Sequence, residues 1–232
     1  MADNYQLDAD TFVSTKEQKL GGLFFGQSSL ASYTIARQSS VVNVTSLIHD
    51  EAELKLFAPL GCGFQTGMGA VDVLAKAGPN DTVVVMGIGG VGFTSIAVRL
   101  APFPLSLYSC HQGAKFNNCH TIIAVDRVKE RLQLALELGA THIIDTSDGA
   151  DLISQVKSIT KGVGSSITID TTGNMKVIEA GLAMTANRGQ MIILGVPPLD
   201  AQLGVHLVSF MQVRQRGNND VWSLNQIRQG RS

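Results

Sequence analysis

The amino-acid sequence predicts an α/β fold built on a doubly wound parallel sheet, preceded by a β-rich segment. A four-residue apolar run, Val83–Met86, leads directly into a glycine-rich turn and then into a helical pattern. Beyond that turn, strand-like and helix-like patterns alternate to about Leu194. The strand-like runs are rich in apolar residues, which is typical of parallel strands that helices cover on both faces. Ligands in such sheets bind at the carboxyl ends of the strands.

The glycine-rich turn has the pattern GxGxxG. Gly87 allows the chain to turn sharply out of the strand, Gly89 allows the backbone to approach a pyrophosphate, and Gly92 allows the helix to pack close to the strand. The free amides and the positive dipole end of the following helix then face the phosphates. The pattern therefore predicts the first βα unit of a Rossmann dinucleotide-binding domain. An ordinary strand-to-helix turn is the alternative interpretation.

The other elements follow from periodicity and from breaker residues. Residues 1–20 are polar and mixed, which predicts poor order. Short strands are expected over Leu23–Phe25, Ser29–Ala36 and Val41–Val44. Helices are expected over Asp50–Phe57, Thr66–Ala77, Val128–Leu138, Asp151–Thr160 and Lys176–Ala186. Parallel strands are expected over Thr121–Val125, His142–Ile144, Ser166–Ile169 and Gln190–Leu194.

Composition excludes several classes of partner. The chain of 232 residues is 44% hydrophobic and 16% charged, with a net charge of -1 and scattered basic residues, so neither nucleic acid nor a membrane surface is an expected partner. The acidic start is not a signal peptide, and no apolar run approaches the ~18 residues that span a bilayer. Three widely spaced cysteines, Cys62, Cys110 and Cys119, fit a reducing, cytoplasmic location.

Several motifs occur in an order that resembles a known family. They are LGCGFQTGMGAV, VVVMGIGGVG, TIIAVDRVKERL, IDTTGN and ILGVPP. The sequence resembles the zinc-containing alcohol dehydrogenases of the medium-chain dehydrogenase/reductase superfamily, most closely the aryl-alcohol type. FFGQSSLASYTIA resembles the final strands of that family's GroES-like catalytic domain. The resemblance implies a catalytic-domain remnant over residues 1–58, an NAD-binding Rossmann domain over 59–212 and a tail outside the family over 213–232.

The resemblance also implies an oxidoreductase that transfers hydride between a small alcohol or aldehyde and NAD. The implied phosphate turn consists of Gly87, Gly89, Gly90, Val91 and Gly92. Asp126 matches the acid that holds the adenosine ribose, where a carboxylate would repel a 2′-phosphate and favour NAD over NADP. Arg131 matches a basic residue near that ribose, and Thr66 matches a contact on the nicotinamide side. Contacts to the nicotinamide half are implied for Thr171, Gly173, Leu194, Gly195 and Val196, with strand-end packing as the alternative.

The resemblance implies an incomplete zinc site. Cys62 matches one ligand of the catalytic zinc, but a catalytic site needs at least three protein ligands. The family's other two ligands and its structural-zinc lobe lie in sequence that has no match here, and no histidine has ligand spacing to Cys62. We therefore expect no complete set of catalytic residues and no zinc bound by this chain alone. A small buried hydrophobe is the alternative role for Cys62.

Two segments depart from the family pattern. Gly92 and Asp126 are farther apart than the roughly 20 residues typical of the fold, and the excess is about the length of segment 98–112. We interpret 98–112 as an insertion from a gene-model error, with a genuine surface loop as the alternative. The tail 213–232 is interpreted as a frame change or truncation.

Three other functions remain open at the level of sequence. The chain could be a catalytically inactive NAD-binding or subunit-associating module, a zinc-free reductase, or a chain without a stable fold. Homo-oligomers formed through the edge of the sheet are a further expectation from the resemblance.

Overall fold

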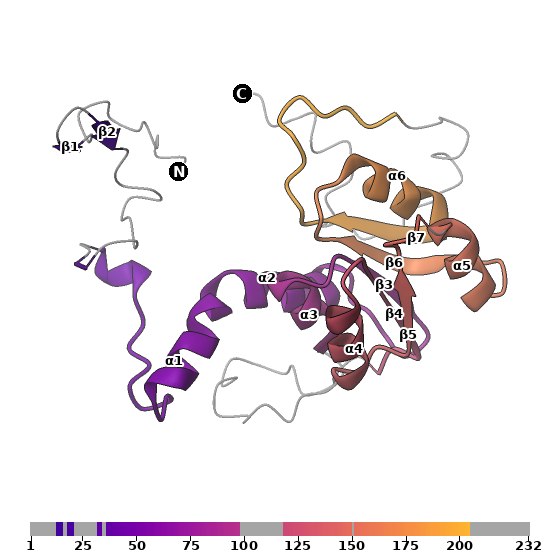
Figure 1. Ribbon diagram of the computed structural model, residues 1–232. Helices are drawn as coiled ribbons and strands as arrows, with labels where there is room; N and C mark the ends of the chain where they lie inside the picture. Colours follow the sequence, from indigo (N-terminus) through magenta and orange to yellow (C-terminus); the bar gives the residue numbers. More distant parts are fainter. Residues whose placement is uncertain are drawn as a thin grey trace. The chain divides into compact units, whose positions relative to one another are not determined.

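A computed structural model describes residues 13–15, 18–20, 32–33, 36–97, 118–149 and 151–204 (Figure 1). The chain divides into two compact units, Met1–Leu54 and Lys55–Ser232. The predicted insertion 98–112, the predicted tail 213–232 and the predicted strand Leu23–Phe25 lie outside the described residues, as does most of Ser29–Ala36.

The first unit contains short elements. Strands β1 (Val13–Thr15) and β2 (Gln18–Leu20) pair antiparallel, a pairing within the 1–20 segment that the sequence did not predict. A 3₁₀ turn, η2 (Gln38–Ser40), follows. The prediction of a strand over Val41–Val44 is wrong: this stretch has no regular secondary structure, and the Val42 side chain is 83% exposed. β-branched residues favour a strand only where a pleated, half-buried surface is available to pack against.

The second unit is built on a five-stranded parallel sheet. Its strands are β3 (Thr82–Met86), β4 (Thr121–Asp126), β5 (His142–Asp145), β6 (Ser165–Asp170) and β7 (Thr185–Ile193). The strand order is β5-β4-β3-β6-β7, and every neighbouring pair runs parallel. From β3, the chain first adds β4 and β5 on one side of that strand and then adds β6 and β7 on the other side. The prediction of a doubly wound parallel sheet is therefore confirmed.

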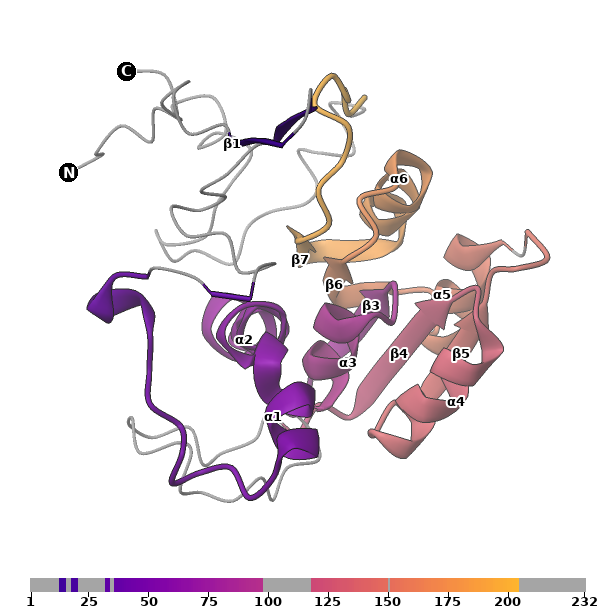
Figure 2. The same ribbon diagram turned by 60° about the vertical axis from the view of Figure 1, so that its left-hand side comes forward.

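Helices cover both faces of this sheet (Figures 1 and 2). Helix α1 (Glu51–Phe57) and the 3₁₀ turn η3 (Ala58–Gly61) precede α2 (Gly63–Gly69), which continues as a π-helix, η4 (Ala70–Leu74). The others are α3 (Gly90–Ala97), α4 (Lys129–Glu137), α5 (Leu152–Ile159) and α6 (Met175–Met184). Helices α1, α4, α5 and α6 begin within one residue of the expected start, and α2 begins three residues before it.

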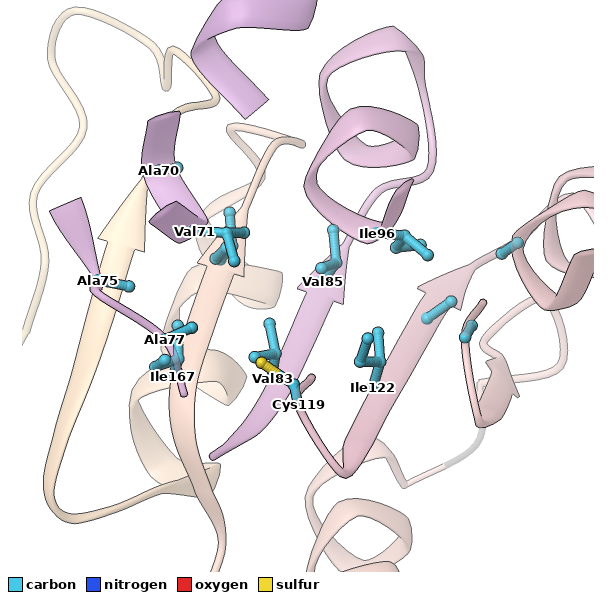
Figure 3. Packing of buried hydrophobic residues seen from close by; sticks show 14 of the residues in the cluster. Ala70, Val71, Ala75, Ala77, Val83, Val85, Ile96, Cys119, Ile122 and Ile167 are labelled. Carbon is cyan, nitrogen blue, oxygen red and sulfur yellow. The ribbon is translucent and has the colours of Figure 1, made fainter. Parts of the chain in front are cut away.

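The alternation of side chains along β3 separates two apolar clusters. Val83 and Val85 face a cluster to which η4, α3 and α4 contribute, including Val71 and Ile96 (Figure 3). Val84 and Met86 face the opposite cluster, where α5 and α6 contribute Val156 and Met184 among others. β3 is the central strand of the five and is buried on both faces, so the turn that follows it lies at the middle of one sheet edge.

Helix α2 begins three residues before the predicted start at Thr66, and its glycines pack against α3: a Cβ on Gly63 would lie 3.6 Å from the Val91 side chain. A Cβ on Gly67 would collide with Thr94 and with the Val91 carbonyl of α3, and the Ser95 hydroxyl donates to Gly67 O at 3.1 Å. The low helix propensity of the segment before Thr66 is therefore overridden by tertiary contact with α3.

Helix α6 ends before the predicted Ala186 because Thr185 already belongs to β7, where it pairs with Ser165. The Thr185 hydroxyl donates to Gly181 O at 2.7 Å and lies 2.7 Å from the hydroxyl of Thr168. A threonine at this position satisfies a carbonyl of the last helical turn and starts the strand at once.

Asp151 makes the start of α5 sensitive to acid. Its carboxylate accepts hydrogen bonds from the amides of Ile153 and Ser154, and the pKa of Asp151 is lowered chiefly by the Ser154 hydroxyl bond. A carboxyl with a lowered folded pKa stabilises the fold above its unfolded pKa, and this stabilisation is lost as pH falls through the folded value. We expect amide exchange at Ile153 and Ser154 to accelerate in that acidic window, measured by NMR. The variant D151N should exchange faster at neutral pH and should not show the acid-dependent increase.

The helices in the described part of the chain are all too short or too polar to cross a membrane.

Candidate functional site

The glycine turn lies between the end of β3 at Met86 and the start of α3 at Gly90. Gly87 has φ +87, a left-handed conformation that favours glycine. A Cβ on Gly92 would collide with the Gly87 carbonyl, so a side chain there would separate the helix from the turn. Gly89 differs, because a Cβ placed on it would meet no atom within 4 Å. The backbone at Gly89 therefore faces open space beside the first turn of α3.

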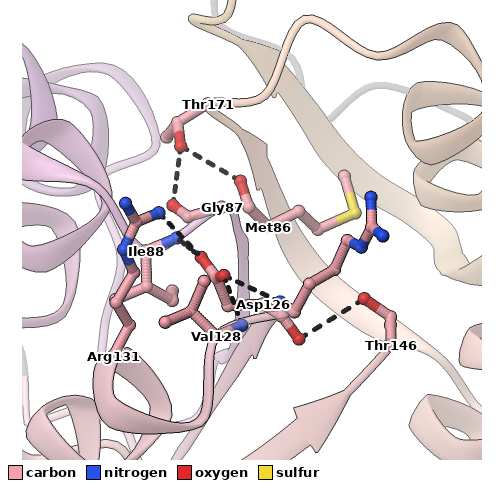
Figure 4. Close-up of polar contacts among 9 residues, drawn as sticks. Met86, Gly87, Ile88, Asp126, Val128, Arg131, Thr146 and Thr171 are labelled. Atoms are coloured by element: carbon pink, nitrogen blue, oxygen red, sulfur yellow. Dashed lines mark hydrogen bonds and ion pairs between the residues drawn. The ribbon is translucent and has the colours of Figure 1, made fainter. Parts of the chain in front are cut away.

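Asp126 ends β4, the strand beside β3, and is buried. Its Oδ2 accepts a hydrogen bond from the Ile88 amide at 2.6 Å, and its Oδ1 accepts from the amides of Arg127 and Val128 at 2.7 and 3.0 Å (Figure 4). The Arg131 guanidinium, half exposed on α4, lies 3.8 Å from Oδ2. The structure thus brings Asp126, Arg131 and the glycine turn together.

The bonding of Asp126 leaves capacity for a further donor. A carboxylate offers about four acceptor positions, of which three are occupied by backbone amides. A ribose hydroxyl is a donor of the kind that could use the fourth. The negative charge that the two oxygens of an ionised Asp126 carboxylate share would also repel a phosphate group.

Thr171 follows β6, the strand on the other side of β3. Its hydroxyl donates to Gly87 O at 2.6 Å and contacts Met86 O at 3.1 Å, and its amide donates to Met86 O at 2.9 Å (Figure 4). These contacts place Thr171 against the glycine turn. The resemblance did not imply the two hydroxyl contacts, in which the Thr171 side chain bonds to backbone carbonyls of the turn and of β3.

Asp170 is a residue that the sequence prediction missed. It ends β6, is fully buried, and accepts hydrogen bonds from the Thr172 hydroxyl at 2.6 Å and from the Gly173 amide at 3.0 Å. Its carbonyl accepts from the amides of Leu194 and Gly195. The loops after β6 and β7 are therefore tied together through Asp170. The available signal was a second buried strand that ends in an aspartate, as the strand before Asp126 does.

The remaining residues predicted for the nicotinamide half lie at the same sheet edge. Gly173 and Gly195 pack backbone against backbone, since a Cβ on Gly195 would collide with the Gly173 amide. Leu194 is half-buried, and the Val196 side chain is exposed. Thr66 lies on α2 and is exposed.

Cys62 precedes α2 and is exposed, so the alternative interpretation as a buried hydrophobe is wrong. Cys119, by contrast, is buried in the core against β3 and β4 (Figure 3). Among residues 36–97, 118–149 and 151–204, no three His, Cys, Asp or Glu side chains are grouped so that they could hold a metal ion. The described residues therefore do not fit a catalytic zinc.

A hollow of about 330 Å³ lies at the opposite end of the sheet, where Asp81 precedes β3, Ser166 begins β6 and Arg188 and Gln190 belong to β7. It is remote from the glycine turn and contains none of the predicted site residues.

The carboxyl edge fits a dinucleotide in three respects. The open space at Gly89 would be filled by any larger residue, and the first turn of α3 presents amides toward that space. Within the described part of the chain, the hydrogen bonds of Asp126 leave one acceptor position open.

Comparison with known proteins agrees with this geometry. The model of the zinc-binding dehydrogenase family matches residues 109–219. A probable alcohol dehydrogenase of a Pseudomonas species is 34% identical over 215 residues, which are 91% of this chain and 62% of the relative. A geraniol dehydrogenase of Castellaniella defragrans is 33% identical over 82% of this chain and 45% of its own length.

Solved structures show the same likeness. Benzyl alcohol dehydrogenase from Acinetobacter calcoaceticus has a TM-score of 0.67 and 31% identity over 81% of this chain and 46% of its own. An alcohol dehydrogenase zinc-binding domain protein from Burkholderia ambifaria has a TM-score of 0.67 and 34% identity over 84% of this chain and 47% of its own. The chain thus spans between 45% and 62% of the length of these relatives. Over that part, the chain resembles zinc-binding dehydrogenases of the alcohol dehydrogenase type in both sequence and fold.

Proposed function

We propose that this chain supplies the NAD-binding part of an alcohol dehydrogenase-like oxidoreductase that acts in the cytoplasm. The observation that carries the proposal is Asp126, a buried carboxylate beside the glycine turn with an acceptor position to spare. Relatives named alcohol dehydrogenase and geraniol dehydrogenase support the reaction class.

The residues of this chain would bind and orient the cofactor. The open backbone at Gly89 and the start of α3 would hold the pyrophosphate, Asp126 the adenosine ribose, and Arg131 the outer side of that ribose. Thr66 and the loops after β6 and β7, through Gly173, Leu194, Gly195 and Val196, remain proposed neighbours of the nicotinamide half. When bound, NAD supplies a hydride acceptor for an alcohol, and the proposed selectivity for NAD over NADP rests on repulsion between Asp126 and a 2′-phosphate.

The alternative function is an inactive NAD-binding or subunit-associating module. Cys62 favours it, because among the described residues no metal-binding group assembles around that thiol. Both functions share the cofactor site and differ only in turnover.

Cofactor titration of the purified chain tests the shared part of the proposal. NADH fluorescence should increase on binding, and NADH should bind at least tenfold more tightly than NADPH. Equal affinities would contradict the assigned role of Asp126, and no binding of either would contradict the cofactor site.

Turnover then separates the two functions. Benzyl alcohol and geraniol are suitable first substrates, because the relatives are named for them. NADH formation that depends on the alcohol supports the enzyme, with the zinc content measured on the same sample. Cofactor binding without turnover at any added zinc concentration supports the module.

A further inference from the structure

One peptide group in the glycine turn is held at both of its polar ends by side chains. The carbonyl of the Gly87–Ile88 peptide accepts from the Thr171 hydroxyl at 2.6 Å, and its amide donates to Asp126 Oδ2 at 2.6 Å (Figure 4). Thr171 follows β6 and Asp126 ends β4, so the two partners come from the strands on either side of β3. In addition, the Gly87 amide donates to Val125 O at 2.8 Å.

We propose that Thr171 and Asp126 form a clamp that fixes the orientation of this peptide and thereby shapes the phosphate turn. Thr171 is then a positioning residue for the pyrophosphate site and makes no contact with the nicotinamide half. The inference rests on the proposed function to the extent that the turn is the part that binds the pyrophosphate.

The chemistry of the two partners admits one orientation of the peptide. Gly87 at φ +87 is in a region where a glycine peptide can rotate with little steric hindrance. Rotation of the peptide by half a turn would exchange its N–H and C=O. The carbonyl would then face the Asp126 carboxylate, which when ionised only accepts hydrogen bonds. The clamp therefore opposes a rotation that glycine alone would permit.

Burial makes these bonds matter for the turn. Ile88 is fully buried, so an amide released by rotation has no access to water. Thr171 is half-buried, and its hydroxyl also contacts Met86 O, which fixes the side chain against the end of β3. Loss of the hydroxyl leaves the Gly87 carbonyl without this donor while the carboxylate on the other side stays in place.

The test compares T171V, which removes the hydroxyl at nearly constant volume, with T171S, which keeps it. T141V is the matched control, since the Thr141 hydroxyl donates to Ile122 O at 3.0 Å at the opposite end of the sheet. Each full-length variant is titrated with NADH and with ADP-ribose, which lacks the nicotinamide. We expect T171V to weaken both ligands by the same factor, about three- to tenfold for one hydrogen bond. T171S and T141V should retain the affinities of the unaltered chain.

Three outcomes would overturn the proposal. A loss for NADH without a loss for ADP-ribose would place Thr171 at the nicotinamide half. Unchanged affinity for both ligands in T171V would show that the hydroxyl does not shape the turn. An equal loss in T171S would show that the size of the side chain, and not its hydroxyl, is responsible.

Amide exchange measures the clamp without any ligand, so it remains informative if the chain binds neither probe. If the chain binds neither NADH nor ADP-ribose, the proposed function fails, and the clamp is tested by the exchange rate of the Ile88 amide alone. We expect the Ile88 amide of T171V to exchange at least severalfold faster than in T171S, with the amides at the centre of β3 unchanged. Equal exchange at Ile88 in the two variants would refute the clamp.

Discussion

The variant D126A is expected to weaken NADH binding by about ten- to a hundredfold, the size expected for one charge-assisted hydrogen bond. Two effects act together. The ribose loses its acceptor, and the Ile88 amide loses the carboxylate that it contacts at 2.6 Å. Because Ile88 is buried, its unpaired amide should also lower the free energy of unfolding by about 1–3 kcal/mol. Fluorescence titration and urea denaturation measure the two effects separately.

Asp145 offers the matched control for Asp126. It ends β5, lies opposite Asp126 in the register of the two strands, and accepts from the Ser147 amide at 2.8 Å. It has no contact with the glycine turn among the hydrogen bonds of the described residues, so D145A should keep the NADH affinity. If D145A and D126A lose affinity equally, the effect is one of general charge and the assigned role of Asp126 is wrong.

Two glycine variants are expected to separate folding from binding. In G92A the new methyl group meets the Gly87 carbonyl, which is backbone and cannot move without distorting the turn. Overpacking of this kind destabilises a protein by about 1–3 kcal/mol. In G89A the methyl group meets no atom within 4 Å, so the unfolding free energy should change little while NADH affinity falls at least tenfold. Urea denaturation and NADH titration of both variants test the separation.

G69A controls for the change from glycine to alanine itself. A Cβ on Gly69 meets no atom within 4 Å, and the residue ends α2. The substitution should raise stability by up to about 1 kcal/mol through its effect on helix propensity and on the unfolded chain, with affinity unchanged. A stable G92A, or a G89A that binds NADH normally, would contradict the assignment of these two glycines.

The parallel sheet could be predicted because each buried strand is visible in the sequence as a short apolar segment. The runs at 83–86 and 122–125 are uninterrupted and apolar, as burial on both faces requires. Helix α2 could not be bounded in the same way, because its glycine-rich first turn has low helix propensity and packs against α3. A local pattern does not contain that contact.

The position of Asp126 at the carboxyl edge of the sheet could be predicted because it ends an apolar strand within a motif that resembles the family. The Thr171 hydroxyl bond to Gly87 could not, because it joins two loops whose proximity follows from the strand order. Asp170 was overlooked for a similar reason: its partners Thr172 and Gly173 are local, but its burial depends on the loop after β7. The sequence thus predicted candidate ligand contacts more readily than the residues that support the turns around them.

The two bonds to the Gly87–Ile88 peptide also bear on the order of folding. Their partners are 38 and 84 residues distant along the chain. Closing loops of this length has an entropic cost that must be met before the contacts stabilise anything. The phosphate turn can therefore reach its native bonding only after β4 and β6 have both docked on β3. Chains that capture a nucleotide would be those whose central three strands are already assembled, so nucleotide binding doubles as a late marker of folding in a refolding experiment.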